Sequence, residues 1–357
     1  AYTAADVAAT DTPGILELGL DIPGLVVPDR PMMAADRVRY QGEAVAAVVA
    51  EDRYAARDAV EAVDVTYDPL DAVVDPVAAT DEDAPTLHEE APDNVAVDWT
   101  IGDEERTREA FADADHVVAV DAVNQRLIPN PMEPRTVLAE YDEGTGKLTV
   151  TMSTQTPHRD RTLLATTLGL PESRIRVKAP DVGGGFGPKG HHYPEEGIAG
   201  WCSMQLGRPV EWQATRRENY LTGTHGRNHD SRAELALDGD GTFRALRVRS
   251  HAGLGGHLST AGPGIATGYF GFSLSNQYRI PAVHCRVTGT FTNTAPIDAY
   301  RGAGRPEAVF LVERLVKKAG TELGVDPTEL RRRNYVEKDE FPYQTPVAVE
   351  YDSGDYE

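Results

Sequence analysis

Residues 174–190 read Arg174-Ile-Arg-Val-Lys-Ala-Pro-Asp-Val-Gly-Gly-Gly-Phe-Gly-Pro-Lys-Gly190 and are the most informative segment of the chain. The segment begins as a predicted β-strand and runs into five glycines, after which residues 195–206 have a helix-like pattern. Glycine lets backbone N–H groups approach an anion closely, and a following helix N-terminus adds partial positive charge. The segment therefore predicts a loop that binds an anionic cofactor.

The same glycines also fit a dinucleotide-binding fingerprint, because Gly185, Gly187 and Gly190 have the spacing GxGxxG, and Glu211 follows near the position of a ribose-binding acid. A nicotinamide-dependent dehydrogenase that uses residues 185–190 is thus one alternative, and a purely structural glycine loop is another. Dinucleotide folds are built from parallel βαβ units, whereas the flanking sequence predicts antiparallel hairpins. We therefore favour a different anionic cofactor.

A second loop, Ala299-Tyr-Arg-Gly-Ala-Gly-Arg-Pro-Glu307, places two arginines just before a predicted helix. Cations at a helix N-terminus oppose the helix dipole unless an anion neutralises them. Either Glu307 is the partner of Arg301 and Arg305, or a bound oxyanion or phosphate takes that place.

A third loop, Ser153-Thr-Gln-Thr-Pro-His158, joins a predicted strand at 147–152 to a predicted helix. At such a junction the amide of Gln155 is able to donate a hydrogen bond to a ligand oxygen. The alternative is that Gln155 is a solvent-exposed residue at the helix cap.

Around these loops the sequence predicts strands and helices in mixed order. Near the N-terminus the expected elements are strands at 37–40, 44–50 and 63–67 and a helix capped by Asp52. Farther along they are a helix at 104–113, a strand at 116–123, hairpins at 140–152 and 232–248, and helices that begin near Pro306 and Asp326. Hairpins mixed with helices predict an α+β fold.

Composition excludes several classes of partner. The chain has 357 residues and a formal net charge of −22, and its length predicts two or more domains. So much negative charge repels phosphate backbones and anionic lipids, so we expect neither a nucleic-acid partner nor binding to a membrane surface. The sequence contains no apolar run of about 18 residues, the length of a membrane-spanning helix.

The charge also predicts a dependence on salt. Six lysines stand against 29 arginines, and aspartate and glutamate are abundant, which we interpret as adaptation to a salty cytoplasm that screens self-repulsion. We expect the chain to lose secondary structure on dialysis into low salt, measured by circular dichroism. A chain that stays fully folded in dilute buffer would contradict this halophilic interpretation.

The cysteines and histidines predict no metal centre. Cys202 and Cys285 lie far apart with no CxxC motif, so we expect two buried thiols and no disulfide or zinc site. Histidines at 191–192, and at 225 and 229, raise the alternative of zinc hydrolase chemistry. Adjacent histidines diverge on a strand and no third ligand is evident, so this alternative is disfavoured.

Taken together and in this order, the three loops resemble the large subunit of the molybdenum hydroxylases, the family of xanthine dehydrogenase, aldehyde oxidase and carbon monoxide dehydrogenase. The resemblance covers nearly the whole chain. Residues 39–50 and 66–70 resemble the α/β hammerhead domain of that family, and further matching segments lie at 130–135, 207–212 and 329–334.

The resemblance implies an α+β fold in which a hammerhead domain precedes a molybdopterin-binding domain. We assign residues 1–78 to a partial hammerhead domain and 79–95, which lack periodicity, to a linker. Residues 96–357 are assigned to the first molybdopterin-binding domain, and we expect the second half of the subunit to be absent.

The resemblance also implies a molybdopterin cofactor with molybdenum, in the cytosine dinucleotide form found in bacterial and archaeal relatives. In the family, the glutamine lies near the molybdenum oxo group, and the glycine-phenylalanine loop packs against the metal centre and lends backbone N–H groups. The implied cofactor-binding residues are Gln155, Gly184, Gly185, Phe186, Gly187, Arg301, Gly302 and Ala303. No residue is expected to ligate the metal directly.

Departures from the family pattern bear on the substrate. Well-defined carbon monoxide oxidisers carry a cysteine whose sulfur bridges molybdenum to copper, and Gly302 stands there, so a copper bridge lacks its soft ligand. The sequence from Ala299 resembles a second group whose substrates are aldehydes or heteroaromatics. Gly190 replaces the glutamate of xanthine-type enzymes and Tyr269 their substrate arginine, which disfavours a purine substrate.

The general-base glutamate of the family belongs to the C-terminal half, so the catalytic residue of this chain stays unknown. We expect the isolated chain to bind cofactor poorly and to be inactive, and a non-catalytic paralogue or truncated subunit is the alternative. The implied partners are an iron–sulfur small subunit with [2Fe–2S] clusters, an FAD-binding medium subunit, the remaining half of the large subunit and a small-molecule substrate. The implied location is the cytoplasm.

Overall fold

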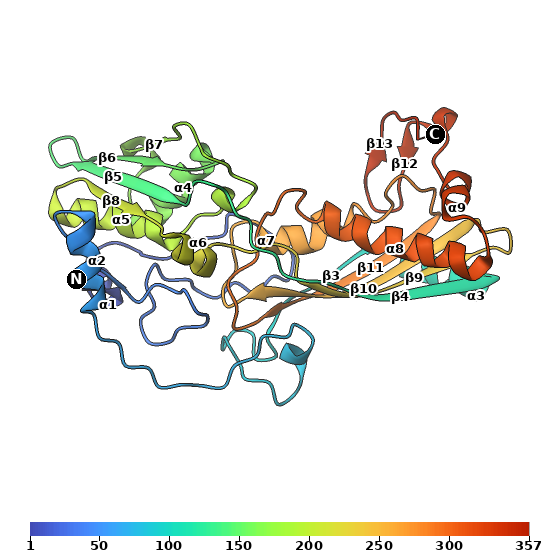
Figure 1. Cartoon of the computed structure of the whole chain (residues 1–357), viewed down its shortest axis with the longest axis horizontal. Coiled ribbons are helices and arrows are strands. Elements are labelled where there is room, and N and C mark those ends of the chain that lie inside the picture. The colour runs from blue at the N-terminus through green and yellow to red at the C-terminus, as the bar shows by residue number, and fades with distance from the viewer. Residues whose placement is uncertain (357) are drawn as a thin grey trace.

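The computed structural model describes residues 1–356 as an elongated molecule with two lobes side by side (Figure 1). The N-terminus lies beside the first lobe, and the described C-terminal end lies at the far end of the second. Between the lobes run the loops that carry the predicted site.

The first lobe is a four-stranded sheet of order β7-β6-β5-β8, covered on one face by helices. Its elements are β5 (Thr136–Asp142), β6 (Lys147–Met152), α4 (Pro157–Leu168), β7 (Ile175–Lys178), α5 (Pro194–Leu206) and β8 (Val210–Gln213). Inward-facing Val137, Leu148 and Val150 alternate with polar residues along the strands and pack against Leu164 and Trp201 of the helices. This period of two fixes the register of the sheet, because a slip by one residue would expose the whole apolar set.

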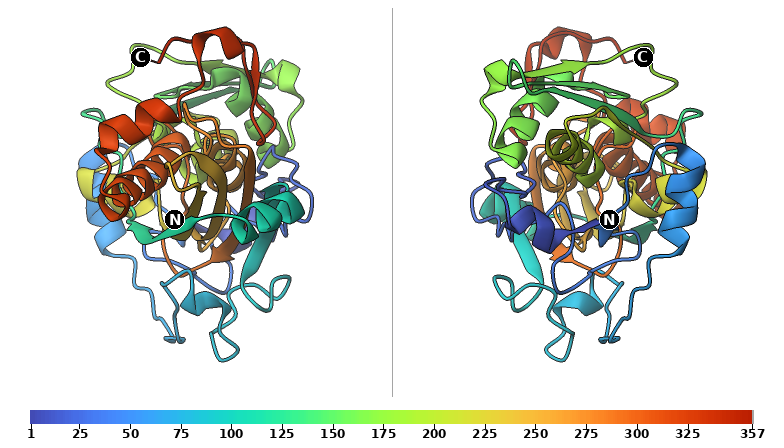
Figure 2. Two further views of the ribbon diagram at one scale, coloured as in Figure 1. Left: turned by 90° about the vertical axis from the view of Figure 1, so that its right-hand side faces the viewer. Right: turned by 90° about the vertical axis from the view of Figure 1, so that its left-hand side faces the viewer.

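The second lobe is a five-stranded sheet of order β3-β11-β10-β9-β4 between helices. Its strands are β3 (Val95–Gly102), β4 (His116–Asn124), β9 (His229–Leu237), β10 (Phe243–Gly255) and β11 (Ala282–Phe291), and its helices are α3 (Glu104–Ala112), α8 (Arg305–Leu323) and α9 (Pro327–Arg333). Leu235 and Leu246 belong to the large core that includes α8, whereas Ala236 and Ala245 pack against α3. Figure 2 shows these two helices on different sides of the sheet.

The remaining elements are short. They are β1 (Tyr2–Thr3), α1 (Ala4–Ala8), β2 (Ala46–Ala47), α2 (Arg53–Glu61), α6 (Arg216–Thr222), α7 (Gly262–Gly264), β12 (Tyr343–Gln344) and β13 (Glu350–Tyr351), with 3₁₀ turns at Ala78–Thr80, Glu172–Arg174, Pro188–Gly190 and Lys338–Glu340 and a π-helical turn at Ile265–Tyr269. Within residues 1–356, no helix is long and apolar enough to cross a membrane.

The α+β fold class is confirmed, and both predicted hairpins form, as β5–β6 and β9–β10. Two parallel pairs were not predicted. Strands β6 and β7, which precede and follow α4 in the sequence, pair in parallel, and β10 and β11 also pair in parallel. The sequence between 147 and 178 therefore forms one βαβ unit, although the sheets as a whole are mixed.

The strands predicted near the N-terminus are mostly wrong. Residues 37–40 and 63–67 form no strand, and only Ala46–Ala47 of the predicted strand 44–50 pairs, with β1. Helix α2 forms as predicted with Asp52 as its cap, yet none of its residues is buried. Strands need a neighbouring backbone for their hydrogen bonds, and the described residues offer these segments only the two-residue β1.

Residues 79–95, interpreted from composition as a linker, pack into the second lobe. Leu87, His88 and Ala91 are almost fully buried, and Asn94 bonds to Leu87, Ala79 and Pro85. Single buried residues anchor this segment to the second lobe. No regular face of a helix or strand is buried, so the sequence of the segment shows no periodicity. The domain boundaries at 78 and 95 stay predictions.

Candidate functional site

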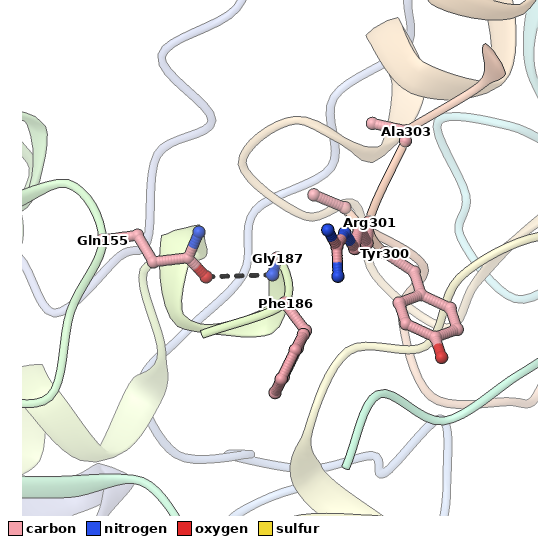
Figure 3. A pocket seen from close by; sticks show the side chains of 8 residues that line it. Gln155, Phe186, Gly187, Tyr300, Arg301 and Ala303 are labelled. Carbon is pink, nitrogen blue, oxygen red and sulfur yellow. Dashed lines mark hydrogen bonds between the residues drawn. The ribbon is translucent and has the colours of Figure 1, made fainter. Parts of the chain in front are cut away.

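The three loops singled out in the sequence meet at one pocket between the lobes (Figure 3). Its volume is about 390 Å³, and it is lined by Gln155, Phe186, Gly187, Ala299, Tyr300, Arg301, Gly302 and Ala303. Gln155 follows β6 and precedes α4, Phe186 and Gly187 follow β7, and Arg301 precedes α8. Gly184 and Gly185 belong to the same glycine loop but do not line the pocket.

Gln155 is held by the glycine loop at two points. Its backbone N–H donates to the carbonyl of Lys189 at 2.9 Å, and its side-chain Oε1 accepts from the N–H of Gly187 at 2.9 Å (Figure 3). Within the described chain Gln155 Nε2 has no acceptor. Gln155 is exposed and stands just before the cap of α4, so its Nε2 is free to donate at the pocket, and its role in binding a ligand stays a prediction.

Gly187 cannot be any other residue without moving the loop that precedes α8. Its φ is 112°, and a Cβ atom there would lie 2.0 Å from the carbonyl oxygen of Ala299. The neighbouring Phe186 has a φ of 58°, and its carbonyl accepts from the N–H of Arg301 at 2.9 Å. The glycine loop and the arginine loop thus touch backbone to backbone.

The glycine loop differs from an open phosphate cradle. The N–H groups of Gly183, Gly184, Gly187 and Gly190 donate within the chain, to Glu133, Val182, Gln155 and Gly187 respectively. Within residues 183–190, all of which the structure describes, the N–H groups of Gly185, Phe186 and Lys189 have no acceptor. Helix α5 begins four positions after Gly190, so the loop does not stand at a helix N-terminus, which disfavours the dinucleotide alternative.

Arg301 is exposed, and no described side chain pairs with its guanidinium. Glu307, which was one of the two candidate partners of Arg301 and Arg305, instead pairs with Arg227 at 3.1 Å in a buried contact. That arginine also donates to the carbonyls of Tyr300 and Arg301, at 3.3 and 3.2 Å. Arg305 lies over the ring of Tyr269. The charge of Arg301 is thus available to an anion in the pocket.

Beneath the glycine loop, the side chain of Lys189 is fully buried and pairs with Glu133 at 2.5 Å. Burial lowers the pKa of the Lys189 amine, against the opposing effect of that pair. Because Glu133 also accepts from the N–H of Gly183 at 2.8 Å, the ion pair fixes the start of the glycine loop.

The histidines have structural roles. His191 contacts Arg30 at 3.0 Å and Thr260 at 2.8 Å, and His192 contacts Glu196 and Thr167. Burial lowers the pKa of His191 well below its usual value, so the ring is neutral near pH 7. In the part of the chain that the structure describes, no three His, Cys, Asp or Glu side chains form a metal site.

Both cysteines are free and buried, as predicted. Burial raises the pKa of the Cys202 thiol to about 11 and that of Cys285 further. One feature beside the site was not found from sequence. Arg227 carries no local signal, because its partner Glu307 lies far along the chain.

Comparisons with known proteins identify the family. The family described as "Molybdopterin cofactor-binding domain" matches residues 87–335, and "Aldehyde oxidase and xanthine dehydrogenase, a/b hammerhead domain" matches residues 3–71. The chain therefore belongs to the molybdopterin-binding large subunits of the aldehyde oxidase, xanthine dehydrogenase and carbon monoxide dehydrogenase family.

Relatives within this family are similar over most of the chain. The carbon monoxide dehydrogenase large chain of Hydrogenophaga pseudoflava is 39% identical over 91% of this chain and 42% of the relative. The nicotine 6-hydroxylase large subunit of Paenarthrobacter nicotinovorans is 37% identical over 91% of this chain and 40% of the relative. The chain spans less than half the length of these relatives.

Solved structures of proteins from the same family are similar to this chain over almost its whole length. The quinoline 2-oxidoreductase of Pseudomonas putida 86 superposes with a TM-score of 0.92 at 34% identity, over 99% of this chain and 45% of that chain. A carbon monoxide dehydrogenase from Oligotropha carboxidovorans gives 0.91 at 35% identity, with the same coverage of both chains.

The residues at the pocket fit an anionic pterin cofactor. Three donors belong to described residues that line the pocket: the unpaired guanidinium of Arg301, the free Nε2 of Gln155 and the free N–H of Phe186. Oxyanions and phosphates accept such hydrogen bonds. None of the described residues that line the pocket is a carboxylate that would repel such a group.

Proposed function

We propose that this chain forms the cofactor-binding part of a molybdenum hydroxylase that oxidises a small organic substrate with water as the oxygen source. The observation that carries the proposal is the convergence of Gln155, Phe186 and Arg301 on one pocket. These residues come from three separate loops of two lobes, and each brings a donor or a close backbone approach to the same place.

The chain's own residues would bind and orient the cofactor. When bound, molybdopterin supplies the metal and its two-electron redox chemistry. Gln155 would direct its Nε2–H to an anionic oxygen, and Arg301 would neutralise negative charge at the pocket. Gly187 permits the close approach of the two loops, and Gly302 and Ala303 leave room because they carry little or no side chain.

An aldehyde or a heteroaromatic ring is the substrate class that we propose. Gly302 offers no thiolate for a copper bridge, which disfavours carbon monoxide. Nicotine and quinoline, named in two of the relatives, are both heteroaromatic. Gly190 and Tyr269, in place of the family's purine-binding residues, disfavour xanthine.

We further propose the finer points that the resemblance implies. The cofactor is the cytosine dinucleotide form, and the base is a glutamate of the remaining half of the large subunit. Electrons leave through [2Fe–2S] clusters and FAD on two partner subunits, in the cytoplasm. Completed by that half, the site is catalytic.

Molybdenum content tests the proposal. We expect the chain, produced with the rest of its complex in a host that makes the cofactor, to carry stoichiometric molybdenum and pterin. Arg301→Ala should lower the molybdenum content about tenfold, because a charge-assisted hydrogen bond to the cofactor is lost. Arg232→Ala, at an exposed arginine of the second lobe, is the matched control and should load normally.

Two outcomes would contradict the proposal. An assembled complex without molybdenum would indicate the non-catalytic paralogue. Saturable binding of NAD by the unmodified chain, measured by fluorescence titration and lost in a Gly185→Val variant, would instead support the dehydrogenase alternative.

A further inference from the structure

We propose that Asp160 is a positioning residue for Gln155, and that its buried carboxylate, acting through the hydroxyls of Thr154 and Thr156, holds the turn that presents Gln155 to the pocket. The importance of this turn for cofactor binding rests on the proposed function. The contacts that hold the turn all lie within the chain.

The carboxylate of Asp160 accepts hydrogen bonds from the hydroxyls on both sides of Gln155. Thr154 Oγ1 donates to Oδ2, and Thr156 Oγ1 donates to Oδ1 at 3.1 Å. The N–H of Thr156 donates to Thr154 Oγ1 at 2.9 Å, so the two threonines also bond to each other. Asp160 is 1% exposed and Thr154 is 4% exposed, which excludes water as a substitute partner.

This network fixes Gln155 against the glycine loop. The carbonyl of Lys189 accepts the N–H of Gln155 at 2.9 Å and lies 3.3 Å from Thr154 Oγ1. The carbonyl of the next residue, Gly190, accepts from Arg159 and lies 3.5 Å from Thr156 Oγ1. Releasing the threonines would therefore free the turn at both ends of Gln155.

Burying the ionised carboxylate of Asp160 costs free energy of folding. Burial, followed by the nearby Glu196 of α5, raises the pKa of Asp160 to about 7, against the lowering effects of Thr154 and His192. Burial likewise raises the pKa of Glu196 to about 8 and lowers that of His192 to about 4. Since the folded-state pKa of Asp160 exceeds the usual value, stability is lost as the pH rises toward about 7, and this loss is complete above that pH.

Because the buried charge of Asp160 costs stability, a variant without the charge distinguishes a role in positioning Gln155 from a role in stabilising the fold. Asp160→Asn removes the buried charge but cannot accept both hydroxyls with an oxygen, because one of its two terminal atoms is an NH₂ donor. At pH 8 we expect this variant to retain or gain global resistance to urea while the turn at Gln155 loosens. If Asp160 had a merely structural role, the variant would lose both its resistance to urea and the order of the turn at Gln155.

Amide hydrogen exchange at single-residue resolution is the measurement, and it needs no cofactor. The N–H of Gln155 reports its bond to Lys189, and the N–H of Gly187 reports the bond to the Gln155 side chain. We expect Asp160→Asn and Thr154→Val to accelerate exchange at both amides about tenfold, the effect of losing one buried hydrogen bond to a charged group. Thr154→Ser keeps the hydroxyl and should restore protection.

Glu172→Gln is the matched control, because Glu172 accepts the hydroxyl of Thr162 at 2.8 Å on the outer side of the same helix. It should leave both reporting amides unchanged. Unchanged exchange in Asp160→Asn and Thr154→Val would overturn the proposal, and so would equal acceleration in β5 and β6 with a lower unfolding free energy. Because exchange is read without cofactor, a failure of molybdenum loading leaves this result intact.

Discussion

Gly187→Ala should be among the most damaging single substitutions in the chain. The new Cβ atom would lie 2.0 Å from the carbonyl oxygen of Ala299, at a φ of 112° that L side chains rarely adopt. The strained backbone and the displaced loop together should lower the free energy of unfolding by about 3–5 kcal/mol. Urea denaturation, followed by circular dichroism, measures this loss.

Gly24→Ala is the control for the backbone conformation alone. Gly24 also has a positive φ, of 77°, but a Cβ there would meet no atom within 4 Å. Its loss should be limited to the cost of the left-handed conformation, about 1–2 kcal/mol. Equal losses in the two variants would show that the close approach of Gly187 to the arginine loop contributes nothing.

Arg227→Met should produce a loss of similar size for an electrostatic reason. The substitution removes one partner of a buried ion pair, whose side chains are 9% and 1% exposed, and leaves the Glu307 carboxylate without its cation. Breaking such a pair costs about 3–5 kcal/mol. The carbonyls of Tyr300 and Arg301 lose a donor as well, so the arginine loop should also become more susceptible to limited proteolysis.

Arg232→Met supplies the comparison. Arg232 pairs with Asp121 at 3.0 Å, but these side chains are 50% and 72% exposed. A solvent-exposed pair contributes less than about 1 kcal/mol. The two variants remove the same functional group, so the difference between them measures burial. A loss in Arg227→Met no larger than that in Arg232→Met would refute the anchoring role of Arg227.

The convergence of the three loops was predictable because the three motifs, in this order along the chain, resemble one known family, whereas no single motif does. Gln155, Phe186 and Arg301 each allowed an ordinary explanation, and only their order resembled a known family. The helix cap at Asp52 and the two hairpins were predictable for a simpler reason, since local residue chemistry determines both.

What the sequence could not predict depends on distant or absent partners. Residues 63–67 alternate between apolar and polar side chains as a strand does. Alternation predicts which face is buried but not which strand pairs with it, and residues 1–356 place no strand beside this segment. Local pairing of Glu307 with the loop arginines was one of two open alternatives, and its actual partner Arg227 is remote in sequence. The glycine loop was expected to keep its N–H groups free, and the acceptors that occupy most of them come from side chains and carbonyls that spacing does not reveal.

The hydrogen bond from the N–H of Arg301 to the carbonyl of Phe186 joins loops that are made at very different times on the ribosome. Until the region before α8 has emerged and folded, the half-built cavity has no guanidinium and no second wall. On the proposed function, we therefore expect cofactor to be inserted only after this region has been synthesised, and a chain that lacks the region to bind none.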